Sequence, residues 1–233
     1  MFFALRHRFA ICGFVSIMSF GGLAIPGGPA VAQTIAPAFS DLESFSAERP
    51  AIERMVTQGI MRGASGTKFA PNSPLTRGDF VIALQKMFQL PPPDQPVVLT
   101  DVSPDDPLFS ATQAAMPYLG RQLLCPGCAL GTNFVPDHPI TLGEQTLALA
   151  RLLVARKKLQ PASAAEAATA LAGIKDAGSV PRLAAPYFAA AIESGLLTVN
   201  PDKTLQLATE QTRVNAATAL DAVQQKFAIP AVK

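Results

Sequence analysis

Apolar and polar positions alternate along this chain in a pattern that occurs three times. Each copy opens with an apolar-x-Asp motif, continues with an apolar stripe at helical spacing and a loop, and closes with a second helix that a Thr begins. In the first copy the positions expected to be buried are Ile52, Met55, Val56 and Ile60 in the first helix and Phe80, Leu84, Met87 and Phe88 in the second. The pattern predicts helix-loop-helix units and therefore an all-α fold.

The spacing of the landmarks is the same in the three copies. Five residues separate Pro71 from Thr76, Pro136 from Thr141, and Leu207 from Thr212. Units of this size cannot bury their own apolar faces, so they must pack against one another. The chain is therefore expected to form a single domain over residues 33–233, with repeats at about 39–90, 99–160 and 174–229. An alanine-rich stretch at 162–172 predicts one additional helix.

Residues 1–32 have the composition of an export signal. Arg6 and Arg8 precede a short apolar run, and Ala30-Val31-Ala32 offers small residues for cleavage; a retained N-terminal anchor is the alternative. Removal of this segment leaves 17 of the 19 basic residues and all 17 acidic residues, so the net charge falls from +2 to zero. Balanced charge disfavours nucleic acid as a partner. No later stretch could span a membrane. These features predict an exported protein of the periplasm, cell wall or cell surface.

Arg77 and Arg213 lie in the first turn of predicted helices, where the helix dipole disfavours a cation. Two interpretations remain open. Each guanidinium, together with the free amides of the helix start, could bind a carboxylate or phosphate. Alternatively, each could form a salt bridge between repeats with the Asp of an opening motif. A ligand lying on such a pair would satisfy both interpretations.

The three opening aspartates, Asp41, Asp101 and Asp176, also have two interpretations. They could cap the turn that follows them, or they could accept sugar hydroxyls at the mouth of a groove between repeats. The neighbouring landmarks are expected to serve the backbone: Thr76 with Asp79 and Thr141 with Glu144 as capping boxes, Thr212 with Asn215 as a weaker cap, Gly59 and Gly195 as helix C-caps, and Gly63 and Gly66 as loop residues with positive φ.

Cys125 and Cys128 are the cysteines that remain after the predicted signal. In an oxidising compartment this pair predicts a small structural disulfide. A redox-active pair is the alternative, although the strand-then-helix context is missing. His138 is the one histidine that follows the predicted signal, so a Ser-His-Asp triad is disfavoured. The sequence therefore predicts no enzyme activity, no cofactor and no metal site.

The repeated motifs resemble the S-layer homology (SLH) domain, which reads Phe-x-Asp-Val, Ala-Ile, Gly-Ile-x-x-Gly, Phe-x-Pro and Thr-Arg-Ala-Glu. The first copy reproduces them at Phe39-Ser40-Asp41, Ala51-Ile52, Gly59-Ile60-Met61-Arg62-Gly63, Phe69-Ala70-Pro71 and Thr76-Arg77-Gly78-Asp79. The other copies depart further, since Leu142 stands at the second Arg position. The family's Trp is Ala47 in the first copy, and the chain has no Trp.

The resemblance implies an all-helical module of three lobes with pseudo-threefold symmetry, whose grooves bind cell-wall polysaccharide that is often pyruvylated and anionic. It assigns polymer contacts to Arg77, Arg213, Asp41, Asp101, Asp176 and Gly63. The leading hypothesis is a non-enzymatic envelope protein that anchors itself or a partner to this polymer. One alternative is a module that has lost the sugar site and binds other envelope proteins. A weaker alternative is a thiol oxidoreductase that uses Cys125 and Cys128.

Overall fold

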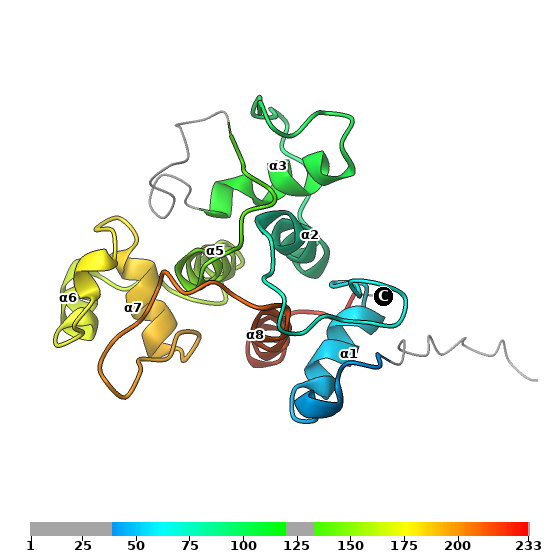
Figure 1. Ribbon diagram of the computed structural model, residues 1–233. Helices are drawn as coiled ribbons and strands as arrows, with labels where there is room; N and C mark the ends of the chain where they lie inside the picture. The colour runs from blue at the N-terminus through cyan, green and yellow to red at the C-terminus, as the bar shows by residue number, and fades with distance from the viewer. Residues whose placement is uncertain (1–38, 120–132, 233) are drawn as a thin grey trace, which may run out of the picture. The chain divides into compact units, whose positions relative to one another are not determined.

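The computed structural model describes residues 39–119 and 133–232 (Figure 1). These residues contain seven α-helices and two short 3-10 helices joined by loops. These residues belong to one compact unit, Thr34–Lys233. The α-helices are α1 (Arg49–Thr57), α2 (Arg77–Phe88), α3 (Pro107–Leu119), α5 (Leu142–Ala155), α6 (Ala164–Leu171), α7 (Ala185–Glu193) and α8 (Arg213–Lys226), and the 3-10 helices are η1 (Glu43–Phe45) and η2 (Ala177–Ser179). The described ranges contain isolated β-bridges and no strand. The predicted all-α class is confirmed.

The predicted helix signals have the expected local geometry. The side chains of Thr76, Thr141 and Thr212 each accept a hydrogen bond from the backbone amide three residues later. Glu144 completes the predicted capping box at the start of α5, whereas at the start of α2 only the Thr76 half of the predicted box is present. Helix α6 confirms the helix that was predicted from the alanine-rich stretch. None of the helices in the described ranges is both long and apolar enough to cross a membrane.

Glycine ends two of the short helices as predicted. Gly59 follows α1 and Gly195 follows α7, with φ of 65° and 66°. Residues with a side chain adopt this left-handed conformation only at a cost, so glycine is the usual residue at this place.

The first helix of each predicted repeat packs against the second helix of another repeat. Helix α3 packs against α2, α7 packs against α5, and α1 packs against α8 at the far end of the sequence; α3 also contacts α5. Figure 1 shows α2, α5 and α8 nearly end-on, with α1, α3 and α7 outside them. Three of these pairs join helices of different predicted repeats, and the α3–α5 pair joins helices of the same one.

A ring of backbone hydrogen bonds joins the loops that precede α2, α5 and α8. The amide of Leu75 donates to the carbonyl of Gln211, Gln211 donates to Ile140, and Ile140 donates back to Leu75, each at 2.8 Å. These residues occupy equivalent places, one position before the capping Thr of each helix. The ring brings the N-terminal ends of the three helices together.

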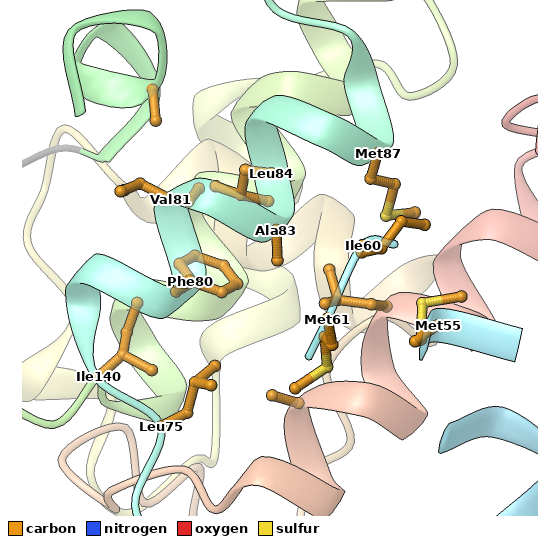
Figure 2. Packing of buried hydrophobic residues seen from close by; sticks show 14 of the residues in the cluster. Met55, Ile60, Met61, Leu75, Phe80, Val81, Ala83, Leu84, Met87 and Ile140 are labelled. Carbon is orange, nitrogen blue, oxygen red and sulfur yellow. The ribbon is translucent and has the colours of Figure 1, made fainter. Parts of the chain in front are cut away.

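The main core lies between α2 and the elements on either side of it. The predicted residues Phe80, Leu84, Met87 and Phe88 are all buried. Figure 2 shows side chains of α2 directed into a cluster that Met55, Ile60 and Met61 also enter. A smaller cluster surrounds Phe188 of α7 and includes Leu147, Leu205 and Leu207.

Candidate functional site

Each opening aspartate binds two consecutive backbone amides in the loop before the second helix of its own repeat. The pairs are Asp41 with Phe69 and Ala70, Asp101 with Phe134 and Val135, and Asp176 with Leu205 and Gln206, at 2.6–3.0 Å. The predicted capping of the following turn is not observed, because neither η1 nor η2 has a side-chain cap. Two amides use only part of a carboxylate's acceptor capacity. The predicted contact with sugar hydroxyls stays a prediction.

The second residue of each of these amide pairs has a left-handed backbone. Ala70, Val135 and Gln206 have φ of 57°, 56° and 54°. Such a conformation costs roughly 1–2 kcal/mol for a residue with a side chain, and it is least common for a β-branched residue such as Val. The aspartate carboxylates hold these residues in place, because they bind their amides.

These contacts predict a dependence of stability on acid. Burial raises the pKa of Asp41 and Asp176, but their backbone hydrogen bonds outweigh it, and both pKa values are lowered. A carboxyl with a lowered folded-state pKa adds stability above its unfolded pKa of about 4 and loses it as the pH falls through the folded value. We expect urea midpoints to fall below about pH 4, and to fall less in an Asp41→Asn, Asp176→Asn double variant. An equal fall in both proteins would contradict this role.

The first-turn amides of the three central helices are already occupied by carbonyls of a neighbouring loop. Arg77, Leu142 and Arg213 donate to His138, Thr209 and Ser73, and Gly78, Gly143 and Val214 donate to Pro136, Leu207 and Pro71, at 2.8–3.0 Å. The free amides that an anion site at the helix start requires are therefore not available. Any anion site at Arg77 or Arg213 must therefore be formed by the guanidinium groups.

The Arg213 side chain crosses from α8 to the first repeat. Its Nε donates to the carbonyl of Phe69 at 2.8 Å, its Nη2 donates to the carbonyl of Arg62, and its Nη1 lies 3.6 Å from Oδ2 of Asp79. The guanidinium carbon lies 4.8 Å from the centre of the Phe69 ring. Burial lowers the pKa of Arg213, and Asp79 opposes that shift. Arginine remains protonated at neutral pH, so a fixed cation results.

Arg77 makes the equivalent contacts with the second repeat. Its Nη2 forms an ion pair with Oε1 of Glu144, with both side chains buried, and its Nη1 lies 3.5 Å from the carbonyl of Phe134. A salt bridge between repeats was one of the two predicted interpretations, but the partner is the acid in the first turn of the next helix and not an opening aspartate. The residues at the equivalent positions of α5 and α8 are Leu142 and Asn215, which carry no charge.

Asp79 and Glu144 are the site residues that the sequence interpretation missed, since it assigned them to helix capping alone. The charges in the first turns of the helices indicate these ion pairs. The two first-turn arginines match the two first-turn acids when each helix is paired with the next, and the uncharged Leu142 then falls opposite the uncharged Asn215. Matching charges around a closed ring would have identified these pairs.

A cavity of about 470 Å³ lies where Arg213 meets the first repeat. Its polar side chains come from Arg62, Ser73, Asp79 and Arg213, and its other lining residues include Gly63, Ala64, Ile60, Met61, Leu75 and Ile82. Of the predicted ligand residues the cavity brings together Arg213 and Gly63. Asp41, Asp101, Asp176 and Arg77 do not line it.

Gly63 is needed for close packing and not, as predicted, for positive φ; neither Gly63 nor Gly66 has a positive φ. A Cβ at Gly63 would lie 2.7 Å from Cε1 of Phe39 and 2.8 Å from the carbonyl oxygen of Ser65. Gly63→Ala should therefore lower the free energy of unfolding by about 1–3 kcal/mol in urea titrations. Gly66→Ala is the matched control, because nothing lies within 4 Å of its Cβ. Equal stability of the two variants would contradict the packing role.

The cysteine pair lies outside the described residues. The predicted disulfide of Cys125 and Cys128 stays a prediction, and the thiol-oxidoreductase alternative rests on sequence alone. Among the residues of 39–119 and 133–232, no group of His, Cys, Asp and Glu could hold a metal ion.

Comparison with known families identifies part of the chain. Residues 38–81 match the S-layer homology domain, and this segment includes Asp41, Gly63, Arg77 and Asp79. No curated protein matches the chain. The match supports an SLH domain, which generally mediates cell-wall anchoring and marks a surface-associated or envelope-associated protein.

Proposed function

We propose that this chain is an exported, non-enzymatic envelope protein that binds an anionic cell-wall polysaccharide in the Arg213 cavity and so anchors itself or a partner. The observation that carries the proposal is the position of the cavity. It lies between the segment that matches the SLH domain and the first turn of α8, where a fixed cation forms part of its wall.

The lining suits a sugar polymer with an acidic substituent. The Arg213 guanidinium has five N–H donors, and the carbonyls of Phe69 and Arg62 take only two of them. The side chain of Asp79 is 44% exposed and can accept sugar hydroxyls, while the exposed Ser73 offers a hydroxyl. The apolar residues of the lining suit the less polar face of a sugar ring. Arg62 is exposed and adds a second positive charge at the cavity.

Retention of the mature protein on purified cell-wall sacculi would test the proposal. Ala64→Glu places a carboxylate in the cavity at an exposed position, so it should weaken binding of an anionic polymer by at least about tenfold without disturbing the core. Ala168→Glu, at an exposed position on α6, is the matched control and should bind normally. Absence of retention, or normal retention of Ala64→Glu, would disprove the proposal.

A second function is favoured by the internal contacts of both arginines. Arg77 and Arg213 are turned toward carbonyls and carboxylates of the protein itself, and the second copy has Leu142 in place of the arginine. These features fit a module that keeps the fold, has lost the sugar site and binds other envelope proteins. Crosslinking in envelope preparations would then capture proteins while purified sacculi retained nothing. Capture of polysaccharide and no protein would contradict this alternative.

A further inference from the structure

A second cavity lies at the other end of α2, away from the Arg213 cavity. Its volume is about 310 Å³, and its lining consists of Met87, Phe88, Gln89, Arg156, Lys158, Ile229 and Pro230. These residues come from the end of α2, the end of α5 and the segment after α8. The Arg156 side chain donates a hydrogen bond to the carbonyl of Phe88, which joins two of these segments. The two cavities share no lining residue, since the Arg213 cavity reaches along α2 only as far as Ile82.

The segments that form this cavity carry only positive charge. Residues 86–89, 155–160 and 222–232 contain no Asp or Glu, and their basic residues are Lys86, Arg156, Lys157, Lys158 and Lys226. One basic residue at a helix C-terminus is explained by the helix dipole. Lys157 and Lys158 are both exposed, and neither takes part in an ion pair within the described ranges. Beside an apolar recess, such a basic rim attracts an acidic ligand.

The recess favours a protein segment over a membrane as the occupant. A surface that enters a bilayer presents apolar side chains that project from it. The exposed large hydrophobic residues of the described ranges are Val97, Val98 and Leu183, and none of them lines this cavity. The apolar residues here form a hollow, so the apolar group must come from the partner.

We propose that this cavity binds an acidic segment of a partner protein. An apolar side chain of that segment fills the space between Met87, Phe88 and Ile229. Its carboxylates pair with Lys158, which lines the cavity, and with Lys157, the exposed residue next to it in the chain. The proposal goes beyond the proposed function, because it gives the chain a second binding site at the opposite end of α2. A chain with both sites would link a partner protein to the cell wall.

Fluorescence anisotropy with the mature protein tests this proposal. The probe is a fluorescein-labelled peptide with a central Leu-Phe pair flanked on each side by two acidic residues. We expect saturable binding that weakens at least about tenfold in a Lys157→Glu, Lys158→Glu variant and also when Ser-Ser replaces Leu-Phe in the peptide. The control variant, Lys175→Glu with Arg182→Glu, makes the same change in net charge at exposed positions outside the cavity and should bind the peptide normally.

Several results would overturn the proposal. These are no saturable binding, equal binding by the two double variants, or retention on vesicles of anionic phospholipid without any peptide binding. Retention on sacculi serves as a separate readout, since the Lys157→Glu, Lys158→Glu variant should keep it. Failure of wall binding would therefore be distinguishable from failure at this second site.

Discussion

Glu144→Gln should lower the free energy of unfolding by about 3–5 kcal/mol, because it removes the carboxylate from a buried ion pair and leaves the charge of Arg77 in place. Both side chains are less than a tenth exposed, so water cannot replace the lost partner. Gln keeps the ability of this position to serve the helix cap, which isolates the effect of charge. Urea titrations followed by far-UV circular dichroism would measure the change.

Glu53→Gln provides the matched comparison at the surface. Glu53 lies 3.7 Å from Arg49 in α1, with both side chains more than a third exposed. Its loss should cost less than about 1 kcal/mol. Adding Arg77→Met to Glu144→Gln should recover much of the lost stability, because a buried pair can often be replaced by apolar groups. A small effect of Glu144→Gln, similar to that of Glu53→Gln, would contradict the importance of this pair.

Asp41→Ala should lower the free energy of unfolding by about 3 kcal/mol, since two hydrogen bonds to a charged acceptor are lost together. The change also removes the group that holds Ala70 in its left-handed conformation. Because Phe69 is fully buried beside Phe39, the loosened loop should affect the core. Thermal unfolding and urea titration would both report the loss.

Asp202→Ala is the control for this substitution. Asp202 is exposed and accepts hydrogen bonds from Thr204, two residues away, within a single turn. Such a local contact should contribute about 1 kcal/mol or less. Equal losses of stability in the Asp41 and Asp202 variants would contradict the role of Asp41 in joining its own segment to the amides of Phe69 and Ala70.

Local features of this fold could be predicted from the sequence because they depend on neighbours within one helical turn. Thr141 with Glu144 forms the expected capping box, and Gly59 has the expected positive φ after α1. The buried stripe of α2 likewise follows from periodicity, which depends only on spacing.

The contacts between repeats could not be predicted in the same way. An opening aspartate such as Asp41 reaches amides 28 and 29 residues away, and no local pattern distinguishes that contact from a helix cap. The sequence predicts a partner for Arg77 among these aspartates, whereas the structure pairs it with Glu144, whose presence the helix cap alone would explain. Glu144 both caps a helix and pairs with Arg77, and a sequence interpretation that assigns one role to each residue identifies only the cap.

The pairing of α1 with α8 determines the order in which the chain can fold. Arg54 of α1 binds Asp221 of α8 through two hydrogen bonds, and the two residues are 167 positions apart. Closing so long a loop carries an entropic cost, which is repaid only when both helices are present. The segment that matches the SLH domain is therefore a unit of sequence but not a unit of folding. Its first helix gains its main partner only after the last helix has been synthesised.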